Sequence, residues 1–368
     1  MMILEALQKV VERRDLSSEE AFMVMEEMMS GEASDPQIAA FLTALRLKGE
    51  TTTEVTGFAR AMREKVHWVT VRSQVESARS GTDSGRLVDT CGTGGDRSHT
   101  FNISTAAAFV AAGAGVQVAK HGNRSVSSRC GSADVMEALG VDLALTPEQV
   151  GTCIDDVGIG FLYAPLLHPA MRHVMTARRD IRIRTVFNIL GPLTNPAHAP
   201  AQVVGVYEER LTELLATALV DLGSKRAFIV AGLDGLDELS PASESRVSEV
   251  RDGRVHTYTL SPEAFGLQRA CLSDLRGGTA EENAQTIRRI LEGEKGPKRD
   301  VVVMNAALAI IAGGQAHDYQ DGARLAARSI DSGAAVQKLC DMVEFSRRHG
   351  GQAASGRCVQ RPRECVES

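Results

Sequence analysis

The sequence predicts an α/β protein, in which a small helical part at the N-terminus precedes a larger part built on a central, mostly parallel sheet. The patterns of residues 1–70 predict helices and no other element. After residue 86, short apolar runs alternate with helical patterns, which is the order typical of a parallel α/β sheet. With 368 residues, the chain can form two domains, or one large domain with an appendage.

Helices are expected throughout the N-terminal part. Apolar residues repeat at helical spacing over residues 3–11. Ser17 followed by Glu20 has the pattern of a capping box, which marks the start of a second helix. A third helix is predicted over residues 35–48, because a proline in the first turn favours a helix start, and a fourth over residues 52–68.

The larger part is expected to follow a linker. Residues 72–86 are rich in Ser, Gly and charge, which predicts a linker or mobile loop. Strands are predicted over residues 87–90, 116–120, 160–163, 203–207 and 227–231, with helices between them over residues 103–112, 132–139, 147–155 and 209–222. A hairpin is expected over residues 246–260, helices return over residues 281–349, and residues 351–368 lack periodicity and predict a loose tail.

Composition and charge exclude several classes of function. The 41 basic and 47 acidic residues give a formal charge of −6, which disfavours nucleic-acid or anionic-membrane binding by the whole surface. Charges interrupt the apolar positions of residues 1–15, and no run approaches the membrane-spanning length of about 20 apolar residues. The 7 cysteines are scattered and never form CxxC, which favours reduced thiols and a cytoplasmic location.

A glycine-rich turn follows the first predicted strand. Residues Gly92–Asp96 read GTGGD, and a helix is expected to open at about Asn102. Glycines between a strand and a helix let successive backbone N–H groups approach a phosphate, and the helix N-terminus adds its positive dipole end. The turn is neither a GxGxxG nor a GxxxxGK[ST] motif, so those nucleotide-binding classes are not supported. A tight connection without a ligand stays open as an alternative.

Two polar loops follow other predicted strands. Residues 120–129 read KHGNRSVSSR, a dense set of cations and hydroxyl groups that suits a polyanion, although a solvated basic loop would look similar. The glycine-rich turn of residues 92–96 and this basic loop together predict a site of diphosphate size. Residues 232–240 read GLDGLDELS, whose adjacent carboxylates suit a hard cation such as Mg²⁺, or form an ordinary acidic turn.

Six motifs in order resemble the anthranilate phosphoribosyltransferase family. They are GTGGD (Gly92–Asp96), TFNIST (Thr100–Thr105), KHGNRSVSS (Lys120–Ser128), HPAM (His168–Met171), TVFNILGPLTNPA (Thr185–Ala197) and GLDELS (Gly235–Ser240). The resemblance extends from the N-terminal helices to about residue 345. It implies a Mg²⁺-dependent transfer of the phosphoribosyl group of phosphoribosyl pyrophosphate (PRPP) to the amine of anthranilate, in tryptophan biosynthesis.

The resemblance also implies a helical domain joined to a larger α/β domain, in a fold class shared with nucleoside phosphorylases. It further implies a homodimer formed through the helical domain. A discontinuous helical domain would bring a segment near residues 165–190 beside the N-terminal helices. The expected ranges are 1–72 for the helical domain, 73–86 for a hinge, 87–349 for the α/β domain and 350–368 for the tail.

Site residues are implied position by position. PRPP would be held by Gly92, Gly95, Asp96, Thr100, Asn102, Ser104, Thr105, Lys120, His121, Gly122, Asn123, Arg124, Ser127, Ser128 and Ser132. Anthranilate would meet Gly92, Asn123, Arg178, His121 and Tyr163, with the neighbouring Arg179 as an alternative to Arg178. Two Mg²⁺ ions per site would be reached by Ser104, Asp237 and Glu238. Arg182 stands where the family usually has glycine.

The expected chemistry needs no covalent nucleophile. Negative charge develops on the departing pyrophosphate, so Lys120, Ser104 and Glu238 are expected to act by stabilising the leaving group, the latter two through the metal. Three alternatives remain: a pyrimidine nucleoside phosphorylase, a non-catalytic nucleic-acid-binding relative, and a transferase with another arylamine or purine acceptor. The acidic net charge and the presence of both Asn123 and Arg178 argue against the second.

Overall fold

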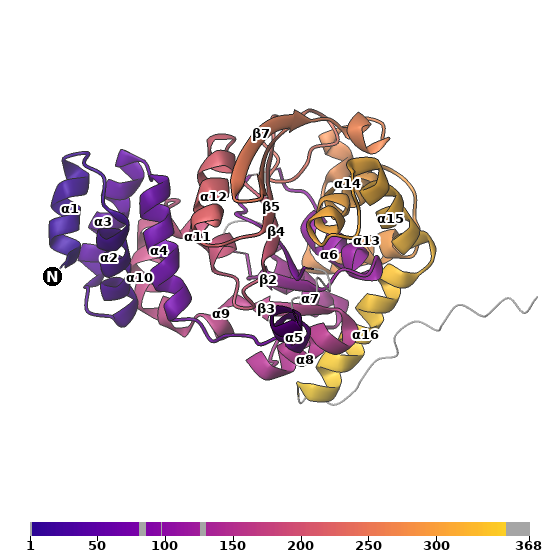
Figure 1. Ribbon diagram of the computed structural model, residues 1–368, viewed down its shortest axis with the longest axis horizontal. Helices are drawn as coiled ribbons and strands as arrows, with labels where there is room; N and C mark the ends of the chain where they lie inside the picture. Colours follow the sequence, from indigo (N-terminus) through magenta and orange to yellow (C-terminus); the bar gives the residue numbers. More distant parts are fainter. Residues whose placement is uncertain (1, 81–85, 97, 126–129, 351–368) are drawn as a thin grey trace, which may run out of the picture.

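A seven-stranded sheet forms the centre of the molecule (Figure 1). The computed structural model describes residues 2–80, 86–96, 98–125 and 130–350. The strand order is β3-β2-β1-β4-β5-β6-β7. The strands are β1 (Val88–Gly92), β2 (Val118–Gly122), β3 (Ile159–Tyr163), β4 (Ala201–Gly205), β5 (Arg226–Gly232), β6 (Ser245–Arg251) and β7 (Arg254–Leu260). The first five run parallel and the β6–β7 hairpin extends the sheet antiparallel, which confirms the mostly parallel sheet and the hairpin.

The strand order reverses direction between β1 and β4. From β1 the chain proceeds outward to β2 and β3, and from β4 it proceeds the other way to β5, so Val88 pairs with both Val118 and Ala201. Open α/β sheets bind ligands in the crevice outside the carboxyl ends of the strands, at the point where the order reverses. The ends of β1 and β4 are therefore the first place to look for a site.

Helices cover the sheet and divide the interior into two cores. The larger core holds the buried side chains of α6, such as Phe109, and those of α14, such as Val302. The other lies against α12 and the N-terminal helices and holds Val204 and Leu215. The helices of the larger part are α6 (Ile103–Gly113), α7 (Ser132–Leu139), α8 (Pro147–Val157), α9 (Ala164–Leu167), α11 (Phe187–Leu190), α12 (Arg210–Asp221), α13 (Ala280–Leu291), α14 (Pro297–Ala312), α15 (Tyr319–Asp331) and α16 (Ala334–His349). Short 3-10 turns are η1 (Pro169–Met171), η2 (Gly191–Thr194), η3 (Pro262–Phe265) and η4 (Leu272–Leu275).

The N-terminal helices form a bundle that a later helix completes (Figure 1). They are α1 (Met2–Val11), α2 (Ser18–Ser30), α3 (Asp35–Lys48) and α4 (Thr52–Glu64). The capping box is present, since the Ser17 hydroxyl accepts from Glu20 N–H and the Glu20 carboxylate accepts from Ser17 N–H. Helix α10 (Arg172–Ile181) packs against α2 and α3 and buries Val174 in the same core. The discontinuous helical part is thereby confirmed.

The connection between the two parts differs from the expected loop. Residues 67–71 form neither helix nor strand and contact the larger part, with His67 N–H donating to Leu167 O and Val69 N–H to Pro196 O, each at 2.9 Å. A helix, α5 (Arg72–Ser80), then follows where a loop was predicted, so that prediction is wrong for this range. The reason is tertiary: the Asp155 carboxylate of α8 accepts from the backbone N–H groups of Arg72 and Ser73, at 2.9 and 3.1 Å, and caps the helix. Residues 81–85 lie outside the described residues, and the hinge stays a prediction.

Two further expectations concern the ends of the chain and its relation to membranes. The predicted tail, residues 351–368, lies outside the described residues. None of the described helices is long and apolar enough to cross a membrane.

Candidate active site

The glycine-rich loop is fastened at the point where the strand order reverses. Gly94 and Gly95 have φ of 64° and 80°, the left-handed region that glycine adopts without strain. Thr93 N–H, in the same loop, donates to Gly205 O at the end of β4, at 2.8 Å. A Cβ on Gly205 would lie 1.6 Å from the Asp237 carbonyl oxygen, so only glycine lets the acidic loop approach β4 this closely. The glycine loop and the acidic loop therefore meet at the β1/β4 crevice.

The three residues expected to stabilise the leaving group lie together beneath this loop. Lys120 is buried, and its Nζ donates to the Thr90 carbonyl and lies 3.4 Å from Ser104 Oγ. Burial lowers the pKa of Lys120, and the negative charges of Asp89 and Glu238 oppose that shift. Glu238 also accepts hydrogen bonds from Ser104, which oppose the rise in its pKa that burial causes. The end of β2, the first turn of α6 and the loop after β5 thus place a cation, a hydroxyl and a carboxylate in one cluster.

Three carboxylates crowd the same place. The N–H of Asp237 donates to Asp96 Oδ2 at 3.5 Å. Burial, followed by the charges of Asp96 and Glu238, raises the pKa of Asp237 well above its usual value. Burial raises the pKa of Glu238 to about 7, against the attraction of Lys120. Carboxylates held so close gain from a positive charge between them.

The oxygens here fit a divalent cation in part. Carboxylate and hydroxyl oxygens are the donors that Mg²⁺ prefers. A cation would also relieve the repulsion that contributes to the raised pKa values of Asp237 and Glu238. Within the described ranges, no group of three or more His, Cys, Asp or Glu side chains is arranged to hold a metal ion alone. A cation bound by Ser104, Asp237 and Glu238 would therefore need further oxygens from a substrate and from water.

Two histidines form a neutral pair behind the end of β2. His121 Nδ1 lies 3.2 Å from the Gly191 carbonyl oxygen, which can only accept, so Nδ1 carries the proton. His121 Nε2 is then an acceptor, and His168 Nε2 donates to it at 3.1 Å. Burial lowers the pKa of His121, and burial together with His121 and His67 lowers that of His168 to about 3. No sequence signal indicated this contact, because His168 stands out only as part of the HPAM motif.

The loop after β2 is tied to α7 and to Tyr163. Arg124 donates to the Glu137 and Asp134 carboxylates at 2.6 and 3.0 Å, and its Nε donates to the Tyr163 hydroxyl at 3.1 Å. Asp134 also accepts from Gly131 N–H at 2.8 Å. The expected role of Arg124 toward PRPP would require it to exchange these partners. Ser127 and Ser128 lie outside the described residues.

Other predicted binding residues line the start of α6. Asn102 Oδ1 accepts from the Asn283 amide of α13 at 3.0 Å, a partner that no sequence signal indicated. Ser98 donates to Asp96 and lies 3.5 Å from the Thr100 hydroxyl. The Thr105 hydroxyl is buried without a hydrogen-bond partner among the described residues. The Ser132 hydroxyl accepts from Asn123 N–H at 3.2 Å.

The structure distinguishes Arg178 from Arg179. The Arg178 guanidinium lies over the Phe187 ring, with Cζ 4.9 Å from the ring centroid. Within the described residues its hydrogen-bond partner is a weak acceptor, Met175 Sδ at 3.9 Å, and burial lowers its pKa to about 10. Arg179 is exposed and pairs with its neighbour Asp180 at 3.6 Å. A half-buried cation with no acid partner among the residues described is the better candidate for a substrate carboxylate.

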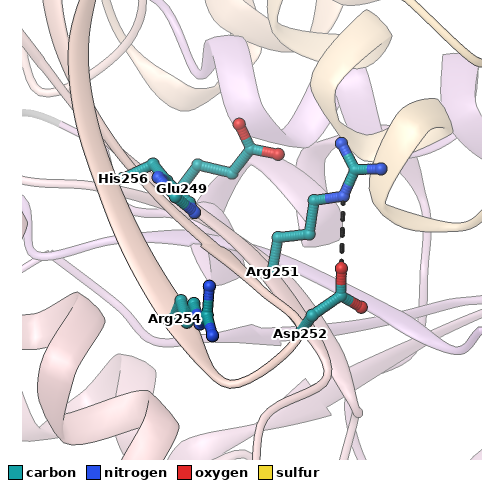
Figure 2. Close-up of a pocket in the computed structure, with 5 residues that line it drawn as sticks. All are labelled: Glu249, Arg251, Asp252, Arg254 and His256. Atoms are coloured by element: carbon teal, nitrogen blue, oxygen red, sulfur yellow. Dashed lines mark ion pairs between the residues drawn. The ribbon is translucent and has the colours of Figure 1, made fainter.

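A hollow at the far edge of the sheet is separate from this site. Figure 2 shows that charged side chains of the β6–β7 hairpin line it, with Arg251 Nε 3.5 Å from Asp252 Oδ2. The lining residues are Glu249, Arg251, Asp252, Arg254 and His256. None of the predicted site residues is among them.

Comparison with known proteins decides the family. The α/β domain of a glycosyl transferase family matches residues 84–336, and the helical bundle domain of that family matches residues 4–66. An anthranilate phosphoribosyltransferase of Desulforamulus reducens is 55% identical over 354 residues, covering 96% of this chain and 99% of the relative. One of Pelotomaculum thermopropionicum is 58% identical, covering 94% and 97%. The chain belongs to the anthranilate phosphoribosyltransferase family.

Solved structures of this family share the fold. The anthranilate phosphoribosyltransferase of Thermus thermophilus is 46% identical, with a TM-score of 0.85, covering 93% of this chain and 99% of that one. The Saccharomyces cerevisiae enzyme in complex with PRPP and Mg is 30% identical, with a TM-score of 0.83, covering 94% and 98%. The predicted fold class, with its helical part and larger α/β part, is confirmed.

Proposed function

We propose that this chain transfers the phosphoribosyl group of PRPP to the amine of anthranilate, giving N-(5-phosphoribosyl)anthranilate and pyrophosphate, in tryptophan biosynthesis. The observation that carries the proposal is the buried cluster of Lys120, Ser104 and Glu238 at the point where the strand order reverses. Family membership supports the same reaction, and the yeast relative is described in complex with PRPP and Mg.

PRPP lies along the carboxyl ends of β1 and β2. Its phosphates meet the N–H groups of residues 92–95, the N-terminus of α6 and Lys120. Asp96, Thr100, Asn102, Thr105, Ser132 and the loop of residues 121–128 complete the binding set. Ser104, Asp237 and Glu238 hold Mg²⁺, two ions per site. When bound, the metal neutralises charge on the phosphate oxygens.

The chain stabilises the leaving group rather than forming a covalent intermediate. The bond between ribose C1 and the pyrophosphate oxygen breaks while the anthranilate nitrogen bonds to C1. Lys120 and the loop N–H groups face the oxygens on which negative charge collects. The proton of the resulting arylammonium leaves to water, so no strong base is needed. Both His121 ring nitrogens are already engaged, by Gly191 and by His168, which supports a role for His121 in shape rather than proton transfer.

Anthranilate binds opposite the sugar. Arg178 pairs with its carboxylate through two parallel hydrogen bonds, and the cost of leaving the half-buried Arg178 without an acid partner is thereby removed. Gly92, Asn123, His121 and Tyr163 surround the ring. A homodimer formed through the helical part and a cytoplasmic location complete the proposal.

The test follows the fluorescence of anthranilate after PRPP is added, with and without Mg²⁺. The proposal expects a loss of signal that needs both PRPP and Mg²⁺. Adenine and a pyrimidine nucleoside with phosphate serve as alternative substrates in parallel reactions. A folded protein that consumes one of these instead, or that consumes nothing, would contradict the proposal.

A further inference from the structure

Arg184 reaches the glycine loop from the helical side of the molecule. It lies between α10 and α11, two residues before Val186, which packs in the core shared with the N-terminal helices. A Cβ on Gly95 would lie 3.0 Å from Arg184 Nη2, so the guanidinium is in contact with the loop. Its other face lies on the Tyr207 ring, with Cζ 4.1 Å from the centroid. Tyr207 comes two residues after β4, so Arg184 sits at the β1/β4 crevice.

The guanidinium of Arg184 has no hydrogen-bond acceptor or ion-pair partner within the described part of the chain. Glu208, beside Tyr207, pairs instead with Arg46 at 3.7 Å and Arg210 at 2.7 Å. Arg63, by comparison, is also half-buried but donates to the Leu193 and Leu222 carbonyls. Arg184 is half-buried and fixed by its stack on Tyr207, yet its donors are unused. Such a preorganised cation is suited to an anion that arrives with a ligand.

We infer that Arg184 is a binding residue for a phosphate oxygen of PRPP. This rests on the proposed function, which supplies the polyanion but assigns no role to Arg184. The N–H groups of the glycine loop and the planar guanidinium would approach one phosphate from two sides. Two reasons favour glycine at position 95. Its φ is 80°, and a side chain there would displace Arg184. Since Arg184 belongs to the helical side, its contact with phosphate links the two parts of the molecule.

Calorimetric titration of PRPP with Mg²⁺ into the full chain tests the inference, using Arg184→Gln, Arg184→Lys and the control Arg179→Gln. Arg179 is a matched control because it lies nearby, is exposed and pairs with Asp180. Loss of a charge-assisted hydrogen bond predicts that R184Q weakens PRPP binding by about tenfold to a hundredfold. R184K, which keeps the charge but not the fork, falls between, and R179Q binds like the wild type. The KM for PRPP rises in parallel, while that for anthranilate stays unchanged.

Titration of pyrophosphate and of ribose 5-phosphate, each with Mg²⁺, locates the phosphate, because only the group that Arg184 meets loses affinity in R184Q. Wild-type affinity of R184Q for PRPP and both probes would overturn the inference, and so would a rise in KM for anthranilate alone. If R184Q lowers the melting temperature, R184K decides: its PRPP affinity falls if the inference holds and equals that of the wild type if it does not. A wild-type chain that binds no PRPP contradicts the proposed function itself, which is a different result.

Discussion

The β1/β4 end and the β2 end of the candidate site differ in the titratable side chains that they bury. At the β1/β4 end, Asp237 and Glu238 lie close to each other and to Asp96, so burial and like charge both raise the pKa values of the Asp237 and Glu238 carboxyls. At the β2 end, His121 and His168 share one hydrogen bond and burial keeps both neutral. Desolvation acts at both ends, but only the first end holds charges that a cation would relieve. The first therefore suits a metal and phosphates, and the second an uncharged ring.

The largest effect is expected at the acidic end. Replacing Asp237 by Asn and Glu238 by Gln together removes the charge that holds the metal, and kcat should fall by at least about a hundredfold. Mg²⁺ activation should disappear, which steady-state assays over a range of MgCl₂ concentrations measure. An unchanged dependence on Mg²⁺ in the folded double variant would exclude these residues as metal ligands.

The next effect is expected at Arg178, which has no acid partner in the described structure. Arg178→Ala should raise the KM for anthranilate by about tenfold to a hundredfold, because a charge-assisted pair is lost, and should change the KM for PRPP far less. Arg179→Ala serves as the control and should leave both constants near their wild-type values. If Arg179→Ala raised the KM for anthranilate instead, the assignment would be reversed.

The neutral histidine pair predicts a pH dependence of stability. The pKa of His168 is about 3 in the folded chain and has a reference value of 6.5 when exposed. The unfolded chain therefore binds more protons below pH 6.5. The stability contributed by neutral His168 is complete above that pH and is lost as pH falls, by up to about 1.4 kcal/mol per pH unit.

Urea unfolding at pH 7.5, 6.5 and 5.5 measures this slope. His168→Gln should make it shallower, because one buried titrating group is removed. The exposed His256, replaced by Gln, should leave it unchanged. Equal slopes for the wild type and His168→Gln would show that His168 is not held neutral by the fold.

The smallest effect is expected at Tyr163, whose hydroxyl contacts Arg124 in the loop after β2. Tyr163→Phe keeps the ring but removes the hydroxyl that accepts from Arg124 Nε. Because a net hydrogen bond contributes only about 1 kcal/mol, the KM for anthranilate should change by less than about fivefold. Steady-state kinetics check this. A larger change would mean that the hydroxyl contacts the substrate directly and would blur the distinction between the two ends.

Sequence patterns predicted most of the secondary structure because those elements depend on local signals. The helix over residues 132–139 has the predicted bounds, and the capping box at Ser17 is formed. Local signals failed at residues 72–80, where the capping carboxylate comes from Asp155, distant in sequence. Arg182 is a milder case: it ends α10 with φ of 52°, the conformation for which glycine is the usual residue.

The sequence by itself determined the alternation of strands and helices, the glycine, basic and acidic motifs at strand ends, and the resemblance that their order carries. These follow from side-chain periodicity and from which residues can turn or donate, and both are properties of neighbouring positions. Only the tertiary structure decided which buried charges lack a partner. It separated Arg178 from Arg179, joined His121 to His168 and placed Arg184 against Gly95. The physical reason is that desolvation and pairing depend on neighbours brought together from distant parts of the chain.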